Sequence, residues 1–527
     1  MAKKVQASNT KKTETATEKK SSGFSLNVDW VHVFILSALF WMIYLWIFNS
    51  NYMDLNGDNF AYFLLGRGLA EGHGYVNATS IHPTPQIHFP PGFPFIIATC
   101  IKLFNADMMD VSFVMGLFYF ISILLFYFTL TKIQASKALA FVVSIFVLLN
   151  QLLMSSAVSC MSEIPFVLAS IAGIFFLVRS ASDDNPLKSW KLLLSVGAFA
   201  IGYYIKSIGI ALFGAMFLYF LFSKKWKHLL VSTGAYVLMV LPWYIRGKQV
   251  GSSYASQLMQ VNPYKPELGN LTMSTFIERI ENNFIRYVSL DIPTSIFGLE
   301  LTTEKTPLSF WITGIMIIAF ILFGIFRLKD YKFFFLGYIV AVFTILLAWP
   351  DAFGGLRFIE VLVPVFLFLF IYGIIGLVEF VLGKLSIASF SPYWLLFFAM
   401  YYYSPLESLK NKLTEPTPQN YRNYFELAKW AKANTPKDAV FSARKPDMFM
   451  YFADRTTIGD KPSLNDTVVL DYFRENSVDY VVLEQLGFAS TAKYLYPAIQ
   501  KNQAKFPIAI QLPNPDTYLL KFTEGDR

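Results

Sequence analysis

The chain has 527 residues, of which 55% are hydrophobic and 15% are charged, and its mean hydropathy is +0.45. Because soluble proteins carry about 25% charged residues, this composition excludes an ordinary soluble globular protein. The formal net charge of +8 does not indicate a nucleic-acid partner, because much of it lies in the amino-terminal tail and in short loops between apolar runs. The 2 cysteines, Cys100 and Cys160, provide neither a disulfide framework nor a thiolate metal site.

Residues 1–28 are rich in Lys, Thr, Ser and Ala and show no hydrophobic periodicity. This composition predicts a disordered basic tail on the cytoplasmic side of the membrane. Its lysines, and the lack of a transit peptide, favour a bacterial inner membrane over an organelle. Apolar runs follow that are long enough to cross a bilayer as helices, and they predict a polytopic α-helical membrane protein with about eleven transmembrane helices. The predicted spans are 29–48, 111–131, 138–155, 163–179, 190–204, 207–222, 229–245, 306–327, 332–349, 358–383 and 386–403.

Short basic loops between the predicted spans set the orientation. Loops that carry Lys or Arg belong on the cytoplasmic side. All the basic loops fall on the cytoplasmic side only if the short apolar segment 93–104, which Pro90 and Pro91 precede, does not cross the bilayer. We expect this segment to re-enter or to lie on the surface. The amino terminus is then cytoplasmic and the carboxy terminus extracytoplasmic. The basic loops are 132–137, 188–191, 224–227 and 327–332.

Two long outer regions and a carboxy-terminal domain follow from this topology. The outer regions, 49–110 and 246–305, belong to a transmembrane domain that covers residues 29–403. Residues 404–527 have nearly balanced charge and a mixed pattern, which predicts a small soluble extracytoplasmic α/β domain. Its expected elements are a helix near 418–434, a strand at 439–443, a helix near 466–476, a strand at 479–483, a helix near 489–500 and two short final strands.

Several charged residues adjoin spans on the outer side. They are Asp58, Glu163, Lys206, Arg246, Asp351, Arg357 and Glu360. Outer basic residues oppose the positive-inside bias, and one anionic ligand at the outer surface would explain Lys206, Arg246 and Arg357 together. A lipid phosphodiester is the obvious candidate, because the planar guanidinium matches phosphate. The alternative is that these side chains snorkel to the interface or pair with nearby carboxylates.

Asp58 lies just after the first span, in Asn56-Gly57-Asp58-Asn59. Transfer of a group onto a hydroxyl or amine needs a base near the attacking atom, and a carboxylate at a partly dry membrane mouth serves this purpose. Alternatively, Asp58 caps the amphipathic helix expected at 59–69. The role of Glu163 likewise has two interpretations, because this residue either caps its helix or faces a cavity.

The first outer region also contains histidines and carboxylates. His82 and His88 lie six residues apart, downstream of Glu71 and His73. These residue types are zinc ligands, but the tight spacing typical of a zinc site is missing.

The motifs of the outer regions follow one another in a characteristic order. They are Gly57-Asp58, Leu69-Ala70-Glu71-Gly72-His73-Gly74, Pro90-Pro91 before a short helix, Ser162-Glu163 at a span start, Pro242-Trp243-Tyr244-Ile245-Arg246, and Gly354-Gly355-Leu356-Arg357-Phe358. This order resembles the bacterial GT-C glycosyltransferases over residues 30–400. Within them it resembles the protein mannosyltransferase and aminoarabinose transferase branch, whose sugar donors are polyprenyl phosphates.

The resemblance implies a membrane glycosyltransferase. It would move a hexosyl or pentosyl group from a polyprenyl-phosphate-linked sugar in the lipid bilayer to an extracytoplasmic protein, lipid or envelope glycan. Asp58 would be the catalytic base of a single displacement that inverts the anomeric carbon. The donor phosphate would be bound by Arg246, Arg357, His88 and Lys206, and the cavity would be lined by Glu163, Tyr62 and Asp351.

Two positions depart from the pattern of that branch. His88 stands near the place of a phosphate-binding Lys, and a His binds phosphate when protonated or as a neutral donor. Asn59 stands where a second acidic residue would complete a metal-binding pair. A divalent metal is therefore compatible with the site but not required, and we expect no other cofactor.

Three other classes of protein share some of these features. A transporter or flippase would carry ionisable residues at mid-depth in its spans, and the predicted spans are nearly free of them. A non-catalytic anchor for the carboxy-terminal domain would leave Asp58, Arg246 and Arg357 unexplained. A ligase that moves a whole glycan from a lipid diphosphate shares this architecture and stays an alternative.

Overall fold

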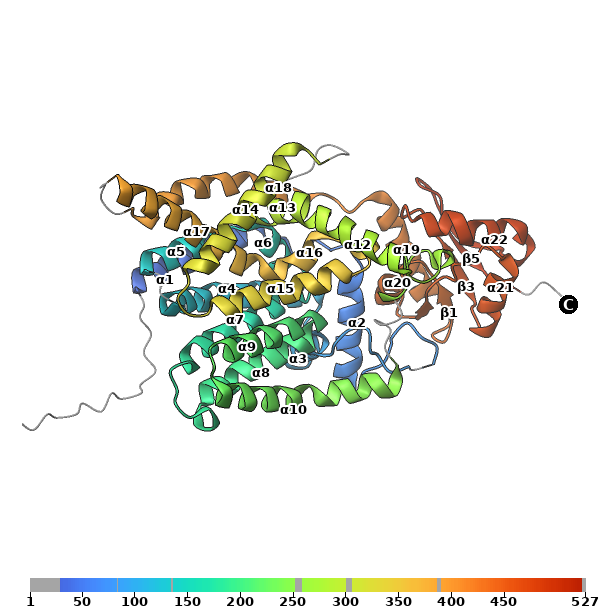
Figure 1. The fold of residues 1–527 in the computed structure, drawn as a ribbon. Coiled ribbons are helices and arrows are strands. Elements are labelled where there is room, and N and C mark those ends of the chain that lie inside the picture. The colour runs from blue at the N-terminus through green and yellow to red at the C-terminus, as the bar shows by residue number, and fades with distance from the viewer. Residues whose placement is uncertain are drawn as a thin grey trace, which may run out of the picture.

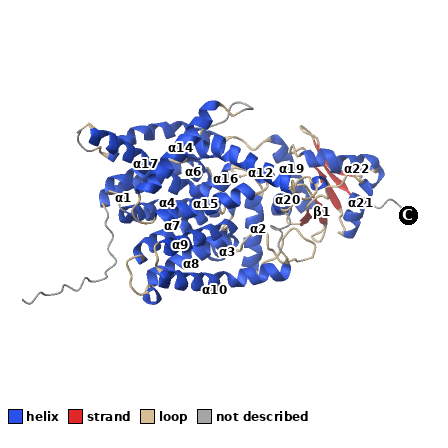
Figure 2. Cartoon of the chain, in the orientation of Figure 1, coloured by secondary structure: helices blue, strands red, loops and turns tan. Residues whose placement is uncertain are grey.

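The computed structural model describes residues 29–82, 84–133, 136–251, 258–299, 306–385 and 390–523. A bundle of long helices occupies most of the molecule, and a sheet with its own helices lies at one end (Figures 1 and 2). We call residues 419–523, which contain this sheet, the C-terminal unit. The predicted tail, residues 1–28, lies outside the described residues.

The bundle contains the helices that the apolar runs predict. They are α1 (Trp30–Ile47), α4 (Met108–Ile133), α5 (Lys137–Leu148), α6 (Gln151–Ala157), α7 (Glu163–Ser180), α8 (Trp190–Ile205), α9 (Ile210–Phe222), α10 (Trp226–Val250), α14 (Leu308–Arg327), α15 (Lys332–Ala348), α16 (Leu356–Ile359) and α17 (Val363–Lys384). The remaining helices before the C-terminal unit are α2 (Asp58–Glu71), α3 (Gly92–Phe104), α12 (Met273–Arg286), α13 (Ile292–Phe297) and α18 (Tyr403–Thr414).

Length and apolar composition identify fewer complete spans than the eleven predicted. Within the described residues, 6 helices pass this test, or up to 7 if the pair α5–α6, bent by 62°, counts as one span. Three other predicted spans form apolar helices that are shorter, namely α8, α9 with the turn before it, and α15. The last predicted span, 386–403, is partly outside the described residues, and residues Pro392–Tyr402 form a 3₁₀-helix, η7. The count of eleven stays a prediction.

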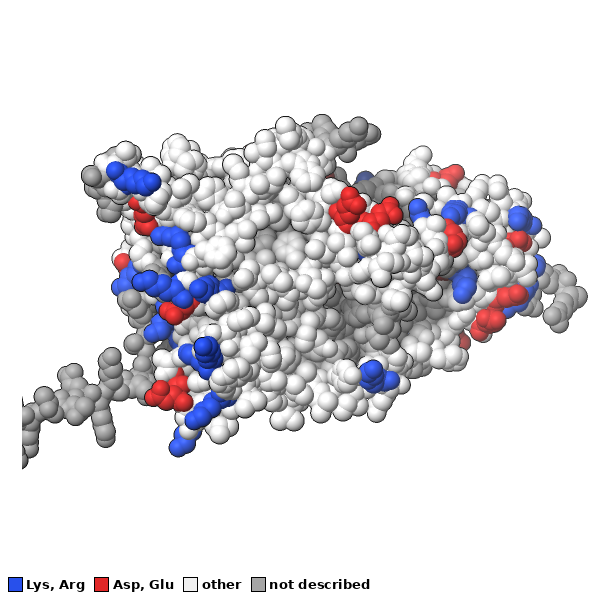
Figure 3. Space-filling model, viewed as in Figure 1, with Lys and Arg blue, Asp and Glu red and all other residues white. Residues whose placement is uncertain are grey.

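The helices differ in how much of their apolar surface other helices cover. The apolar window of α7 is 83% buried and that of α10 is 22% buried. A helix that is apolar all round and buried lies in the centre of a bundle, so α7 is central and α10 peripheral. Large apolar side chains such as Leu238 and Phe326 remain exposed. On the face in Figure 3, charged side chains gather at the two ends and the surface between is almost uncharged, as a lipid-facing surface requires.

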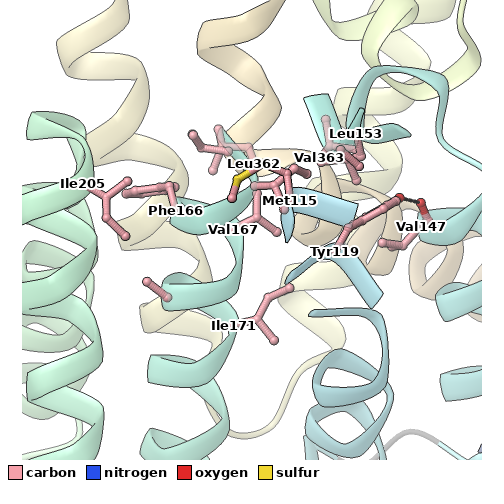
Figure 4. Close-up of a cluster of buried hydrophobic side chains, with 14 of the residues drawn as sticks. Met115, Tyr119, Val147, Leu153, Phe166, Val167, Ile171, Ile205, Leu362 and Val363 are labelled. Atoms are coloured by element: carbon pink, nitrogen blue, oxygen red, sulfur yellow. Dashed lines mark hydrogen bonds between the residues drawn. The ribbon is translucent and has the colours of Figure 1, made fainter. Parts of the chain in front are cut away.

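The core forms where α4, α7 and the start of α17 meet. Met115, Val167 and Val363 lie close together there, the ring of Tyr119 extends from the same place toward Val147, and all four side chains are almost fully buried (Figure 4). The hydroxyl of Tyr119 donates to the carbonyl of Val147, so the polar end of this buried ring is satisfied. This packing fixes the start of α7, which carries Glu163, and the start of α17, which Glu360 precedes.

Glycine residues let α14 and α17 approach closely. A Cβ on Gly373 would lie 2.1 Å from the carbonyl oxygen of Phe320, and one on Gly324 would lie 2.2 Å from that of Leu369. We expect Gly373→Ala to force the helices apart and to destabilise the protein by about 1–3 kcal/mol, seen as a lower unfolding midpoint in detergent. Gly383→Ala on the same helix is the matched control, because nothing lies within 4 Å of its Cβ position. An equal midpoint for the two variants would contradict this account.

The first outer region packs as two short helices. Gly66 on α2 lies against Ile97 on α3, whose Cγ2 would be 2.5 Å from an added Cβ. With 13 residues, α3 spans about 20 Å, which is less than the ~30 Å of a bilayer core. This length favours the expectation that the segment 93–104 does not cross the bilayer, which stays a prediction. In Figure 1, α2 runs across the direction of the bundle helices, between them and the C-terminal unit.

The C-terminal unit contains a five-stranded mixed sheet in the order β2-β1-β3-β5-β4. Strand β1 is parallel to β2 and β3, and β5 is antiparallel to β3 and β4. The bounds are β1 (Val440–Ser442), β2 (Thr456–Ile458), β3 (Tyr480–Leu483), β4 (Ile508–Leu512), β5 (Thr517–Lys521), α19 (Gln419–Asn434), α20 (Pro446–Ala453), α21 (Asp466–Glu475) and α22 (Tyr496–Lys501). The predicted helices and strands are present, and β2 and α20 were not predicted.

Aromatic contacts join the C-terminal unit to α2. The ring of Tyr451 on α20 lies edge-on to Phe60 and Phe63, with centroid distances of 5.3 and 5.5 Å. Arg67 on α2 adds an ion pair with Asp454 at 3.9 Å. The beginning of α2 is consequently held between the bundle and the C-terminal unit.

Candidate functional site

A cavity of about 770 Å³ lies at this junction. Its apolar lining includes Ile205, Ile208, Ile345, Leu346, Phe358 and Val361 from the bundle. Its polar lining includes Asn56, Asp58 and Tyr264 from the outer segments, Lys445 from the C-terminal unit, and Lys206 and Arg357 from the bundle. Of the residues that the sequence singled out, Asp58, Tyr62, His88, Lys206 and Arg357 line this cavity.

Asp58 is the first residue of α2, and it does not cap this helix. The N-cap is Gly57, whose φ of 105° favours glycine, and there is no side-chain cap. The carboxylate of Asp58 instead accepts from Arg357, with Oδ2 2.7 Å from Nη2. The structure thus places Asp58 in an ion pair at the cavity.

Glu163 joins two of the cavity cations. It begins α7, and Oε1 lies 2.6 Å from Nζ of Lys206 and 3.5 Å from Nε of Arg357. The side chain of Glu163 is 1% exposed, and its position in the first helical turn favours the charged form. Asp58, Arg357, Glu163 and Lys206 therefore form one continuous chain of opposite charges. Glu163 does not act as the helix cap, because Ser162 holds that position.

A second buried carboxyl, Glu360, lies beside this chain of charges. Glu360 is 0% exposed, and its Oε2 accepts from Oγ of Ser156 at 2.8 Å. Among the described residues, Oε2 of Glu163 and Oε1 of Glu360 are buried without a hydrogen-bond partner. The sequence noted Glu360 only as a possible ion-pair partner.

His88 and Tyr62 complete the wall next to Asp58. Burial lowers the pKa of His88 below its ordinary value of 6.5, against the opposing pull of Asp58. The imidazole is therefore neutral at pH 7. A neutral imidazole binds a phosphate by hydrogen bonding rather than by charge. The hydroxyl of Tyr62 lies 3.2 Å from Oγ of Ser162, next to Glu163.

Arg246 and Asp351 do not line the cavity. Arg246 lies inside α10, which continues to Val250 beyond the predicted end of the span. Its Nη2 donates to the carbonyl of Tyr75 at 2.8 Å. Asp351 is exposed at the start of a 3₁₀ turn whose next residues, Ala352 and Phe353, do line the cavity.

The histidines of the first outer region lie apart. His73 contacts Glu71 at 3.4 Å, and both side chains are at least half exposed. Within the part of the chain that the structure describes, no group of three His, Cys, Asp or Glu residues could hold a metal ion.

Lys445 of the C-terminal unit is a site residue that sequence reasoning missed. Its Nζ donates to the carbonyl of Asn56 at 2.6 Å, 389 residues away in sequence. It follows β1, and ligand sites in parallel sheets lie beyond the carboxyl ends of the strands. This rule would have indicated Lys445 if the strand order had been known.

The same sheet edge holds the buried carboxyl of Asp460, which follows β2. Oδ1 of Asp460 accepts from Oγ of Ser442 at 2.8 Å, and burial raises the pKa of Asp460 from 3.8 to about 7. In the unfolded chain the carboxyl loses its proton near pH 4, but in the folded chain it keeps it until about pH 7. The unfolded state therefore binds fewer protons, and this group costs stability as the pH rises through that window.

We expect Asp460→Asn to be increasingly favourable at higher pH. The difference between the unfolding midpoints of the variant and the wild type should shift in favour of the variant by about 2–4 °C between pH 5 and pH 8. Any constant effect of the amide cancels in this comparison between pH values. A difference between the two proteins that stays the same from pH 5 to pH 8 would contradict the prediction.

Comparisons with known proteins give one family match and several fold matches. The sequence model of the dolichyl-phosphate-mannose-protein mannosyltransferase family (PMT_2) matches residues 88–245, less than half of the chain. The Archaeoglobus fulgidus oligosaccharyltransferase, solved in complex with Zn and sulfate, has a TM-score of 0.59 and 14% identity, covering 93% of this chain and 72% of that one. No curated protein sequence matches significantly.

ArnT from Cupriavidus metallidurans also shares the fold. Its apo structure has a TM-score of 0.57 and 10% identity, covering 93% of this chain and 97% of that one. Its structure bound to undecaprenyl phosphate has a TM-score of 0.58 and 11% identity, covering 94% and 99%. Likeness at these identities shows a common fold. It confirms the resemblance to GT-C membrane proteins of the mannosyltransferase and ArnT type that the motif order indicates.

Proposed function

From the premise that this chain is a multi-pass membrane protein of the GT-C fold, we propose that it is a glycosyltransferase that uses a polyprenyl-phosphate-linked sugar. The observation that carries the proposal is the position of Asp58. It is a carboxylate bound to Arg357 in a cavity that both apolar and polar side chains line. A ligand with a lipid tail and a polar head fits such a cavity, and ArnT was solved with undecaprenyl phosphate bound.

The residues divide into a base and phosphate-binding groups. Asp58 removes the proton from the acceptor hydroxyl or amine. The acceptor atom bonds to the anomeric carbon as the bond from that carbon to the phosphate oxygen breaks, and the lipid phosphate leaves with the electron pair. The attack and the departure occur on opposite faces of the sugar, so the configuration inverts. Arg357 orients Asp58, and its remaining donors, with Lys206 and His88, stabilise the phosphate.

Arg246 is proposed as an outer phosphate contact, because its guanidinium has donors beyond the one that binds Tyr75. A leaving lipid phosphate carries less charge than a nucleotide diphosphate, and cationic side chains suffice to stabilise it. The proposed chemistry therefore requires no divalent metal.

We propose that the cavity and the C-terminal unit face the extracytoplasmic side of a bacterial inner membrane. Basic loops gather at the opposite end of the bundle. There Lys225 donates to the carbonyl of Ala181 at 2.5 Å, and Lys191 pairs with Asp183 at 3.1 Å. Clustered Lys residues in short loops mark the cytoplasmic side. The acceptor, a protein, lipid or envelope glycan, then reaches the cavity from the outside.

The test is donor turnover by the purified wild type in lipid vesicles. The protein is offered a panel of polyprenyl-phosphate sugars and one lipid-diphosphate oligosaccharide, and released lipid phosphate is scored. We expect release from one of the monophosphate sugars. A cavity of about 770 Å³ is in the range that holds a drug-sized ligand, which suits one sugar with its phosphate better than a long glycan. Turnover of the diphosphate donor alone would assign the chain to glycan ligases, and no turnover with any donor would contradict the proposal.

A further inference from the structure

Two adjacent cations, Arg444 and Lys445, follow β1 at the carboxyl edge of the parallel strands. Both pack against the ring of Phe488, with distances to its centroid of 4.8 Å for Arg444 and 5.2 Å for Lys445. Lys445 lines the cavity beside Asp58. Arg444 lies near the cavity residue Tyr264, whose pKa burial raises and the charge of Arg444 opposes.

The other cations of the cavity already have carboxylate partners. Arg357 lies 2.7 Å from Asp58, and Lys206 lies 2.6 Å from Glu163. Among the residues that the structure describes, neither Arg444 nor Lys445 has a carboxylate within the 4.0 Å limit of an ion pair. Nε of Arg444 is buried and has no hydrogen-bond partner in the same part of the chain.

The surroundings of this pair favour an additional negative group. Burial lowers the pKa of Lys445 below 10.5, although Asp58 opposes the effect. Asp447 is also close, but burial raises its pKa to about 7, so it is only partly ionised at neutral pH. A desolvated cation without a full counter-charge is unfavourable, and an anionic ligand would supply that charge.

The position of Lys445 indicates which substrate would bring the anion. Lys206 belongs to the bundle, Lys445 to the C-terminal unit, and Asp58 to α2, which lies between them (Figure 1). In an inverting displacement the acceptor and the leaving phosphate lie on opposite faces of the sugar. The donor phosphate at Lys206 therefore places the acceptor on the side of Asp58 that faces Lys445.

We propose that Arg444 and Lys445 bind a phosphate or carboxylate group carried by the sugar acceptor. This inference rests on the proposed function, and it names the class of acceptor as anionic. The C-terminal unit is then part of the substrate site, because it supplies the charge that selects the acceptor. A planar guanidinium beside an ammonium group suits such an oxyanion.

The test measures two kinds of phosphate separately in nanodiscs. Tryptophan fluorescence, to which Trp349 in the cavity wall contributes, reports titrations with undecaprenyl phosphate and with inorganic phosphate at constant ionic strength. We expect the wild type to bind inorganic phosphate even when undecaprenyl phosphate is saturating. Lys445→Ala should weaken inorganic phosphate at least tenfold and change the affinity for undecaprenyl phosphate less than twofold. Lys445→Arg should keep both affinities.

The matched control is Lys429→Ala, which removes an exposed Lys of the same unit that pairs with Glu426 at 2.9 Å. It should change neither affinity. Competition between the two phosphates, or equal affinities of Lys445→Ala and the wild type for inorganic phosphate, would overturn the inference. So would a wild type that binds no inorganic phosphate. Failure of the proposed function is distinct, since it would appear as no binding of undecaprenyl phosphate and no donor turnover by the wild type.

Discussion

Asp58→Asn should lower donor turnover by about 10²–10⁴-fold, the usual contribution of general base catalysis. The amide has the shape of the carboxylate, and its oxygen still accepts from Arg357, which lies 2.7 Å from Oδ2 in the wild type. It cannot take the proton of the acceptor. Release of polyprenyl phosphate from the donor found with the wild type measures the effect, and donor binding should change little.

The control for this variant is Asp351→Asn. Asp351 is an exposed carboxylate at the same end of the bundle, outside the residues that line the cavity. Its loss should leave turnover unchanged. An Asp58→Asn protein that is folded and turns over donor at the wild-type rate would remove Asp58 from the role of base.

Glu163→Ala should lower the free energy of unfolding by about 3–5 kcal/mol, because it leaves a buried cation without its partner. Nζ of Lys206 lies 2.6 Å from Glu163, and the Lys206 side chain is only 12% exposed. The unfolding midpoint in detergent measures the loss, which should be about 5 °C or more. An exposed pair gives the comparison: Glu426→Ala, which breaks the contact with Lys429, should cost less than about 1 kcal/mol.

A second substitution separates the charge effect from the loss of packing. In Glu163→Gln with Lys206→Met, the buried pair is replaced by neutral groups, and most of the lost stability should return. Arg357 keeps Asp58 as its partner in this protein. If the double variant were as unstable as Glu163→Ala, packing rather than an uncompensated charge would explain the loss.

The sequence predicts the bundle well because long apolar runs leave few alternatives. It is less informative where helix type changes. Residues Pro392–Tyr402 form a 3₁₀-helix, η7, in place of the expected α-helix. Apolar composition alone does not separate these two forms, so a transmembrane α-helix is the natural prediction for 386–403.

For the site, the sequence identifies charged residues that lie beside spans on the outer side. It misses residues whose position in the site depends on tertiary contacts. Asp58, Lys206 and Arg357 meet in the cavity as charges on the outer side predict. Arg246 has the same signal, yet it is not among the residues that line the cavity, and it lies inside α10, which continues past the expected boundary. Lys445 has no local signal at all, because its contact with Asn56 depends on how the C-terminal unit docks on α2.

The apolar and polar side chains that line the cavity suit two substrates whose concentrations are expressed on different scales. A lipid-linked donor is present at a mole fraction of the bilayer lipids, whereas a water-soluble acceptor is present at a molar concentration in water. Adding inert lipid at constant total donor should therefore raise the apparent KM for the donor in proportion to the dilution. The apparent KM for a water-soluble acceptor would not change, so kinetic constants for this protein have meaning only when the lipid ratio is given.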